Sequence, residues 1–318
     1  MKEIKYYSLI FLLVLLACRQ PYEPPPIKAD YNFLVVEGVI NTTPNSSTTI
    51  LLSRTRNLAD TFLTSPERFA QIEIESGSGN LYNLMEGEPG IYTSNQLTLN
   101  PNQTYRLHIW VGNDQFISDF VTVKNTPPID SITWKRDDGV TLYANTHDPQ
   151  NNTRYYRWDF IETWQYRSVY ETDMGVQNGM IYFRDSTNQI YNCWRSMNST
   201  EILLASSVRL SQDVIDKMPL QIIPEKSEKL SVRYSMLLKQ YALTEEAYKY
   251  WEILQKNTQK LGTLFDAQPS QLVSNIYNTT NPSEPVIGYI SACNVQEKRI
   301  FIRNFEVFPW EGSFSSPA

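Results

Sequence analysis

The chain has 318 residues and a formal net charge of −6, because 34 acidic residues outnumber 28 lysines and arginines. No basic stripe interrupts this acidic balance, which argues against nucleic acid as a partner. A chain of this length can bury a substantial hydrophobic core, and it more often forms two domains than one.

The first residues have the features of an export signal. Charged residues precede an apolar run at 9–17, which is too short to cross a bilayer because a spanning helix needs about 20 residues. The run ends in LLAC, residues 15–18, which matches the bacterial lipobox. We therefore expect residues 1–17 to be a lipoprotein signal peptide and Cys18 to become the acylated, membrane-anchoring N-terminus.

A proline-rich segment, residues 18–29, follows the anchor. It contains three consecutive prolines, Pro24 to Pro26, which favour an extended polyproline conformation that rises about 3.1 Å per residue. Such a segment acts as a semi-rigid spacer. We expect it to be a tether that holds a folded body away from a lipid bilayer.

Residues 30–126 are expected to form the first β domain. The run 71–75 alternates apolar and polar side chains, as a strand with one wet face does, and the polar cluster 76–80 turns the chain back. The pattern from Leu99 to Ile109 resembles the late strands of fibronectin-type or carboxypeptidase-regulatory-like domains. Short strands at about ten-residue spacing are typical of antiparallel sandwiches, so we expect an immunoglobulin- or fibronectin-like β-sandwich.

Residues 125–128 (NTPP) mark the expected boundary to a second β domain, residues 127–318. Residues 164–229 are rich in polar turns and are expected to be an irregular insertion in that domain. The fold class predicted for the whole chain is therefore mainly β, with two antiparallel β-sandwich domains and one inserted amphipathic helix.

The inserted helix is expected at residues 244–261. Thr244 is a suitable N-cap, two glutamates follow it, and Gly262 supplies a C-terminal stop. The residues at helical spacing along one side are Ala247, Trp251, Leu254, Thr258 and Leu261. We expect this stripe to pack against a sheet, with Trp251 facing inward; the alternative is a helix that binds a partner.

Only Cys193 and Cys293 remain as free cysteines once Cys18 is acylated. In an exported protein these two residues can form a disulfide, provided that their Cα atoms lie roughly 4.4–6.8 Å apart. Two separately buried thiols are the alternative, and the sequence leaves both interpretations open.

The polar segment from Trp164 to Trp194 carries aromatic residues that are candidates for a partner- or ligand-binding surface. These residues are Trp164, Tyr166, Tyr170, Tyr182, Tyr191 and Trp194. Exposed tyrosine and tryptophan side chains suit stacking on sugars and the centres of protein interfaces. The alternative is an ordered insertion packed on its own aromatic side chains.

The sequence contains no motif of a known catalytic or metal site. It has no glycine-rich phosphate loop, no HExxH and no GxSxG, and its only two histidines are His108 and His147. Asp137 and Asp138 are expected to form a turn, and the oxygen-rich stretch 147–152 fits no standard calcium loop. We therefore expect no catalytic residue, no metal, no cofactor and no enzymatic activity.

Three blocks near the C-terminus resemble a known protein family. They are RYSMLLKQYALTEEAYKYWE at 233–252, LGTLFDAQPSQ at 261–271 and NPSEPVIGYIS at 281–291. These blocks are similar to those of the DUF4249 lipoproteins of Bacteroidota. The resemblance extends more loosely from Cys18 onward, and it implies an abbreviated C-terminal part, because family members often continue further.

The resemblance implies a function without a defined chemistry. Family members resemble outer-membrane lipoproteins that travel with TonB-dependent, SusC-like β-barrel transporters. The implied role is an accessory subunit that captures a ligand or covers the transporter, lipid-anchored in the outer membrane, with the cell surface favoured over the periplasmic face. Two alternatives remain: a stand-alone surface module that binds a glycan or a peptide, and a hydrolase with an unrecognised site.

Overall fold

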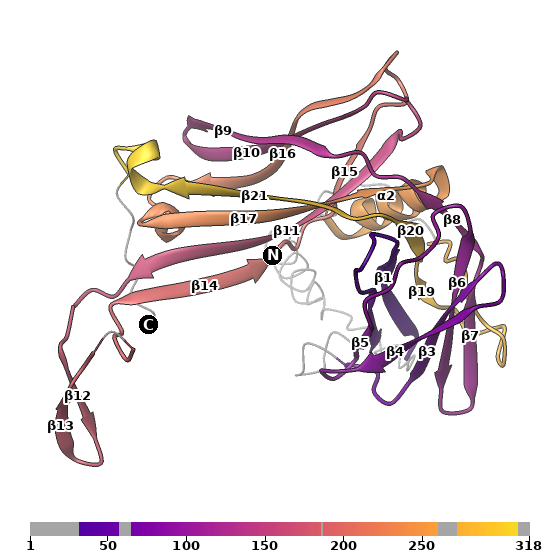
Figure 1. The fold of residues 1–318 in the computed structure, drawn as a ribbon, viewed down its shortest axis with the longest axis horizontal. Coiled ribbons are helices and arrows are strands. Elements are labelled where there is room, and N and C mark those ends of the chain that lie inside the picture. Colours follow the sequence, from indigo (N-terminus) through magenta and orange to yellow (C-terminus); the bar gives the residue numbers. More distant parts are fainter. Residues whose placement is uncertain (1–31, 57–64, 186, 260–271, 311–318) are drawn as a thin grey trace, which may run out of the picture.

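The computed structural model describes residues 32–56, 65–185, 187–259 and 272–310 (Figure 1). The predicted signal peptide, Cys18 and the proline-rich tether lie outside the described residues, as do Leu261, the last residue of the predicted helical stripe, and the helix stop at Gly262. Within the described part, the prediction of a mainly β chain with one α-helix is confirmed. No helix in these ranges is both long and apolar enough to cross a membrane.

Strands of the N-terminal region form a closed barrel, at the right of Figure 1. Its eight strands follow the order β6-β3-β4-β5-β2-β1-β20-β8, and β8 then pairs with the start of β6. Their bounds are β1 Leu34–Asn41, β2 Thr49–Arg54, β3 Gln71–Ser76, β4 Leu81–Glu86, β5 Ile91–Ser94, β6 Thr104–Val111, β8 Val121–Lys124 and β20 Ser291–Cys293. Outside the ring, β7 (Asp114–Ser118) and β18 (Ile276–Asn278) extend the sheet from β6, and β19 (Ile287–Gly288) pairs with β1.

The prediction of two sandwich domains is wrong, because this sheet closes on itself. Strand β20 lies between β1 and β8 and runs parallel to both, while Val121 on β8 pairs with Tyr105 on β6. The strand that completes the ring therefore comes from the far end of the chain. Local alternation predicts each strand but carries no information about which distant strand lies beside it.

The barrel interior is filled by side chains that alternate along each strand. Ile72 and Ile74 on β3, and Leu107 and Ile109 on β6, are buried, and the residues between them are only partly buried. This period of two is what the sequence shows at 71–75, and it places one face of each strand inside a small barrel.

A second body consists of two sheets that share a hydrophobic core. The smaller sheet has the order β16-β10-β9, and the larger sheet has the order β14-β11-β17-β21 with β15 also paired to β11. The bounds are β9 Ile129–Asp137, β10 Gly139–Asp148, β11 Tyr155–Arg167, β14 Asn192–Asn198, β15 Leu203–Ser206, β16 Asp213–Pro224, β17 Arg233–Ala242 and β21 Gln296–Arg303. Two 3-10 turns, Glu228–Leu230 and Asn304–Val307, follow β16 and β21.

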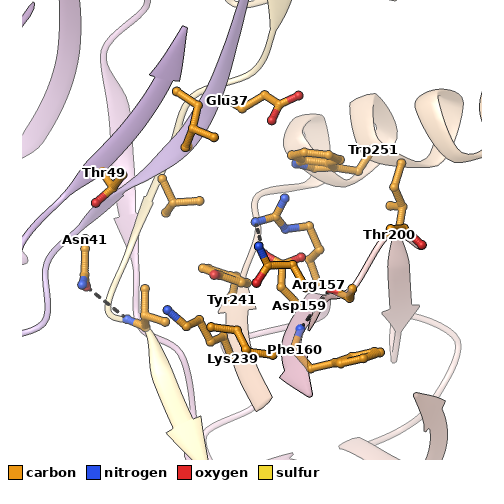
Figure 2. Close-up of a pocket in the computed structure, with 18 of the residues that line it drawn as sticks. Glu37, Asn41, Thr49, Arg157, Asp159, Phe160, Thr200, Lys239, Tyr241 and Trp251 are labelled. Atoms are coloured by element: carbon orange, nitrogen blue, oxygen red, sulfur yellow. Dashed lines mark hydrogen bonds and ion pairs between the residues drawn. The ribbon is translucent and has the colours of Figure 1, made fainter. Parts of the chain in front are cut away.

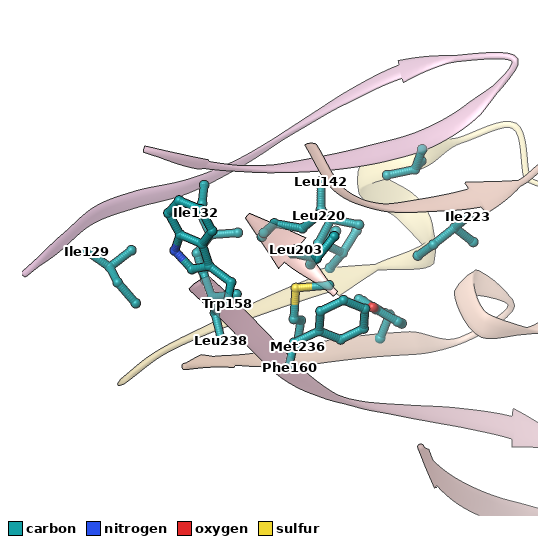
Figure 3. Close-up of a cluster of buried hydrophobic side chains, with 14 of the residues drawn as sticks. Ile129, Ile132, Leu142, Trp158, Phe160, Leu203, Leu220, Ile223, Met236 and Leu238 are labelled. Atoms are coloured by element: carbon teal, nitrogen blue, oxygen red, sulfur yellow. The ribbon is translucent and has the colours of Figure 1, made fainter. Parts of the chain in front are cut away.

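Figure 3 shows the side chains that meet between these two sheets. Trp158 and Met236 project from the larger sheet, and Leu142 and Leu220 project from the smaller one. On β11 the even-numbered residues from 156 to 164 are buried, and all of them except Glu162 are members of this core. The odd-numbered residues of β11 therefore lie on the outer face of the larger sheet, which faces away from the core.

Residues 164–229 contain more regular structure than the sequence predicts. They include strands β14, β15 and β16, as well as a separate hairpin of β12 (Met174–Gln177) and β13 (Met180–Phe183). The pairing of β16 with β10 contains register shifts, and Lys217 has a positive φ of 50°. Such bulges interrupt the alternation that identifies a strand from sequence.

The chain passes between the two bodies more than once. After α2 (Glu245–Gln259) it returns to the barrel as β18, β19 and β20, and then joins the larger sheet as β21. A small apolar cluster lies at this junction and includes Tyr241, Leu243, Ala247 and Cys293. The junction fixes the barrel beside the larger sheet, and a cleft lies between the two.

Candidate functional site

A cleft of about 630 Å³ lies between the barrel and the larger sheet (Figure 2). Strands β1 and β2 form one wall, β11 and β17 form the floor, and Trp251 and Leu254 of α2 contribute from a third side. This volume is within the range of roughly 300–1,000 Å³ that is typical of small-ligand sites.

Helix α2 places Trp251 at the edge of the cleft. The Oγ1 atom of Thr244 accepts a hydrogen bond from the backbone N–H of Ala247 at 3.2 Å, so the helix begins at the predicted N-cap. Ala247 and Tyr250 are buried, whereas Trp251 is only half-buried. The predicted stripe therefore packs on its first turns, and Trp251 packs on one side while it lines the cleft on the other.

Arg157 is held between two aromatic rings at the cleft floor. Its guanidinium carbon lies 4.2 Å from the ring centroid of Trp251 and 4.6 Å from that of Tyr241, a distance at which cation–π attraction operates. Its Nη2 atom donates to Asp159 at 3.1 Å. The side chain is buried, and its Nε atom has no hydrogen-bond partner among the residues that the structure describes. The two rings and Asp159 thus hold the guanidinium in place, while one of its N–H donors, at Nε, is left without a hydrogen bond.

The polar lining of the cleft is acidic. Lys239 forms an ion pair with Glu297, with 3.3 Å between Nζ and Oε1, and Arg157 is paired with Asp159. Two further carboxylates, Glu37 and Glu201, line the cleft without an ion-pair partner among the described residues. Hydroxyl and amide groups complete the lining; they are Asn41, Ser47, Thr49, Asn198, Ser199 and Thr200.

Among the described residues that line the cleft there is neither a histidine nor a cysteine. Activation of a serine or cysteine nucleophile for acyl transfer usually relies on a neighbouring histidine. The cleft instead offers fixed charges, hydroxyls, amides and aromatic rings. This chemistry suits reversible binding of a polar ligand.

The aromatic residues predicted to form a contact surface do not lie together. Trp164 is only 2 % exposed, and its Nε1 atom donates to Glu228 at 3.1 Å inside the second body. Tyr166 also packs against that core. Both residues occupy even-numbered positions of β11, and the sequence alone cannot tell which parity of this strand faces inward.

The other members of the predicted surface are distributed over three places. Trp194 lies on the outer face of the larger sheet and is 52 % exposed, and Tyr170 in the adjoining loop is 81 % exposed. The ring of Tyr191 lies beneath the guanidinium of Arg167 at 5.6 Å. Tyr182 lies on β13 and covers Gly175 of β12. Only Tyr170, Tyr182, Tyr191 and Trp194 therefore remain available for a contact.

The hairpin of β12 and β13 projects from the second body, at the lower left of Figure 1. The turn is Asn178-Gly179, with φ of 52° and 76°, which is the backbone that a two-residue hairpin prefers. One face of the hairpin carries four apolar side chains, each at least 52 % exposed. They are Met174, Val176, Ile181 and Phe183.

The features described so far do not show which protein family the chain belongs to, but comparison of its sequence with models of known families does. The sequence matches the model of "Domain of unknown function (DUF4249)" over residues 19–299. The chain belongs to the DUF4249 family. The family predicted from the blocks at 233–291 is thereby confirmed, and no curated protein matches the chain.

A solved structure similar in part to this DUF4249 protein is the crystal structure of a DUF4785 family protein from Legionella pneumophila. The two share 8% sequence identity with a TM-score of 0.22, and the match covers 65% of this chain and 52% of that one. The chain thus spans about half the length of that protein.

In the part of the DUF4249 protein that the structure describes, the two cysteines, Cys193 and Cys293, are both free. Cys293 is buried at the junction of the two bodies, and this burial raises the pKa of its thiol to about 11. Cys193 lies on β14 and is partly buried. Of the two interpretations that the sequence left open, the structure has separate thiols.

Both histidines pair with carboxylates in ways that serve the fold. His108 lies 2.5 Å from Glu75 on the neighbouring strand, and His147 lies 2.8 Å from Asp130. The hydrogen bond that His147 donates to Asp130, together with the negative charge of Asp130, raises the pKa of the exposed His147. In the ranges that the structure describes, no group of three or more His, Cys, Asp or Glu side chains could hold a metal ion.

The oxygen-rich turn at 147–152 is organised around Asp148. Burial opposes ionisation of this carboxylate, but backbone N–H groups of Gln150, Thr153 and Asn152 donate to it and lower its pKa overall. Its oxygens are therefore committed to the turn.

Proposed function

We propose that this DUF4249 protein is a non-enzymatic lipoprotein of the outer membrane in Bacteroidota, and that it is an accessory subunit of a TonB-dependent, SusC-like transporter. The lipobox at Cys18, the tether at 18–29 and the family resemblance support anchoring and location. The apolar face of the β12–β13 hairpin is the observation that carries the proposal of a protein partner.

The exposed apolar face of the hairpin does not contribute to the core of the chain. Among the described strands, β12 and β13 pair only with each other, and a two-stranded hairpin is marginally stable in water. No charged residue occurs between Met174 and Phe183, although exposed strand edges usually carry charges that prevent association. Met and Phe are enriched at the centres of protein interfaces. A partner that covers this face would remove four apolar side chains from water.

The tether explains how a modest hairpin could sustain a stable contact. Both the transporter and the anchored chain are confined to one membrane, so their encounter resembles an intramolecular reaction with a high effective concentration. In this arrangement the cleft between the bodies is the place for ligand capture. Its aromatic rings, fixed charges and hydroxyls suit a polar nutrient that is passed to the transporter.

Affinity purification from native membranes in mild detergent tests the proposal. We expect the wild-type chain to recover a β-barrel transporter and Ile181→Asp to lower the recovery about tenfold or more, as loss of an interface hot spot does. Met85→Asp on the barrel is the matched control, because Met85 and Ile181 are both 72 % exposed. Equal recovery with Ile181→Asp, or no transporter with the wild type, would refute the proposal.

A further inference from the structure

The outer face of the larger sheet carries a cluster of arginines, which we call the arginine face. It comprises Arg167, Arg233, Arg299 and Arg303 with the aromatic residues Trp194 and Phe301. The pairings place these residues on one face: Trp194 pairs with Gln165, Gln165 with Arg233, and Arg233 with Arg303. No acidic residue occupies the positions of this face from Ile161 toward the end of β11.

The four arginines have no carboxylate partner among the described residues. Arg299 donates to the hydroxyl of Ser235 at 2.8 Å. Glu306, beyond the end of β21, accepts from the backbone N–H of Arg303 and forms no ion pair with its side chain. A concentration of unpaired positive charge is unexpected in a chain with a net charge of −6, and it creates a local field that attracts anions.

Two aromatic side chains are fixed beside this charge. The guanidinium carbon of Arg233 lies 5.1 Å from the ring centroid of Trp194 and 5.9 Å from that of Phe301. Trp194 is 52 % exposed and Phe301 is 55 % exposed, so each ring still presents surface to solvent. Guanidinium groups bind planar carboxylates with paired hydrogen bonds, and open aromatic surfaces stack on sugar rings.

We propose that the arginine face binds an acidic oligosaccharide, namely a chain of uronic acid residues. The inference rests on the ligand-capture role proposed above and names the class of ligand. Guanidinium groups would hold the carboxylates, Trp194 and Phe301 would contact the sugar rings, and the amide and hydroxyls of Gln165, Ser196 and Thr163 would pair with sugar hydroxyls.

The sheet geometry favours a sugar over an acidic peptide. An extended peptide is usually recognised through main-chain hydrogen bonds to a free strand edge. Strands β11 and β17 at the centre of the face are paired on both sides, so the face offers side chains alone. Side-chain donors and aromatic surfaces suit the hydroxyls, carboxylates and ring faces of a sugar chain.

The arginine face continues into the cleft. Ile161 and Asn198 line the cleft, and their cross-strand row continues through Leu237 to Arg299. A polymer bound on the arginine face could therefore reach the cleft floor at Asp159 and Lys239. The cleft end is acidic and the opposite end is basic, so the charge of the floor would orient the bound chain.

Isothermal titration of the purified protein with hexagalacturonic acid tests the inference, with an uncharged hexasaccharide as the comparison. We expect binding of the acidic chain only, weakened by added salt because the contacts are partly exposed. Arg299→Gln should lower the affinity about tenfold, the effect of losing one charge-assisted hydrogen bond. Arg209→Gln, which removes an exposed arginine outside the face, should change it less than about twofold. Trp194→Ala should also weaken binding.

Several results would overturn the inference. No binding of the acidic hexasaccharide, equal binding of the uncharged one, or insensitivity to Arg299→Gln would each do so. Equal affinity for polyglutamate or an oligonucleotide would show a general anion site instead. Affinity purification of the Arg299→Gln variant distinguishes failure of this inference from failure of the proposed function. Recovery of the transporter depends on the hairpin, so the variant should recover it as the wild type does even if the arginine face binds no sugar.

Discussion

Gln240 lies near the C-terminal end of β17, and its replacement by methionine tests the packing that supports the cleft floor. The side chain is completely buried. Its Oε1 atom accepts from Trp158 Nε1 at 2.8 Å, and its Nε2 atom donates to the carbonyl of Pro127 at 2.8 Å and to Thr146 Oγ1 at 3.0 Å. One amide thus joins both sheets to the segment that leaves the barrel.

Methionine fills a similar volume but satisfies none of these groups. The Trp158 N–H and the Pro127 carbonyl would lose their partners, and each buried unsatisfied group costs about 1–3 kcal/mol. Thr146 retains its hydrogen bond to the carbonyl of Pro128. Burial of the apolar methionine offsets part of the loss, so we expect Gln240→Met to lower the free energy of unfolding by about 3 kcal/mol.

Urea denaturation followed by tryptophan fluorescence measures this change. The control is Gln212→Met, because Gln212 is exposed and exposed substitutions usually change stability by less than about 0.5 kcal/mol. If the free energy of unfolding of Gln240→Met is within about 0.5 kcal/mol of the wild-type value, the hydrogen bonds of the buried amide do not stabilise the second body as proposed. Hydrogen exchange should locate the loss of protection in β17 and β9.

Three further predictions concern the cleft, the thiols and pH. Trp251→Ala should lower the free energy of unfolding by about 2 kcal/mol, which is less than the 3–5 kcal/mol expected for a fully buried tryptophan. Calorimetric melting measures this change, and no loss of stability would contradict the stacking of Trp251 on Arg157. Iodoacetamide at pH 8 should modify Cys193 in the native protein but Cys293 only in urea, because burial raises the pKa of the Cys293 thiol to about 11. Peptide mass spectra that show Cys293 labelled in the native protein would contradict this. The hydrogen bond from Arg106 lowers the pKa of Glu75 although burial opposes it, so its stabilising contribution should be present above about pH 5 and decline as pH falls below about 4. The stability difference between wild type and Glu75→Gln should therefore shrink in acid, and a difference independent of pH would be inconsistent with the ion pair.

The sequence predicts local structure well where one signal dominates. The alternation at 71–75 gives β3 its buried Ile72 and Ile74, and Thr244 with the glutamates after it begins α2. These signals depend on neighbouring residues only. Closure of the barrel depends on β20 meeting β1 and β8 across most of the chain, and no local pattern specifies that contact.

The candidate sites were harder to predict, for physical reasons that differ between them. The cleft combines β1, β2, β11, β17 and α2, which are distant in sequence. The arginine face can be recognised only when it is known which residues of β11 point into the core. On that strand Trp164 points into the core, whereas its neighbour Gln165 lies on the outer face. The hairpin had a signal that could have found it: Asn178-Gly179 between apolar residues is a strong two-residue turn pattern.

Site-specific photocrosslinking in intact cells tests the central claim most directly. A photoreactive amino acid would replace Ile181 on the apolar hairpin face, and in a matched strain it would replace Met85 on the barrel. The account predicts a covalent adduct from position 181 to a TonB-dependent β-barrel transporter, identified by mass spectrometry, and none from position 85. Efficient labelling at position 181 without any β-barrel adduct, or equal adducts from both positions, would contradict the proposal that this hairpin holds the protein to a transporter.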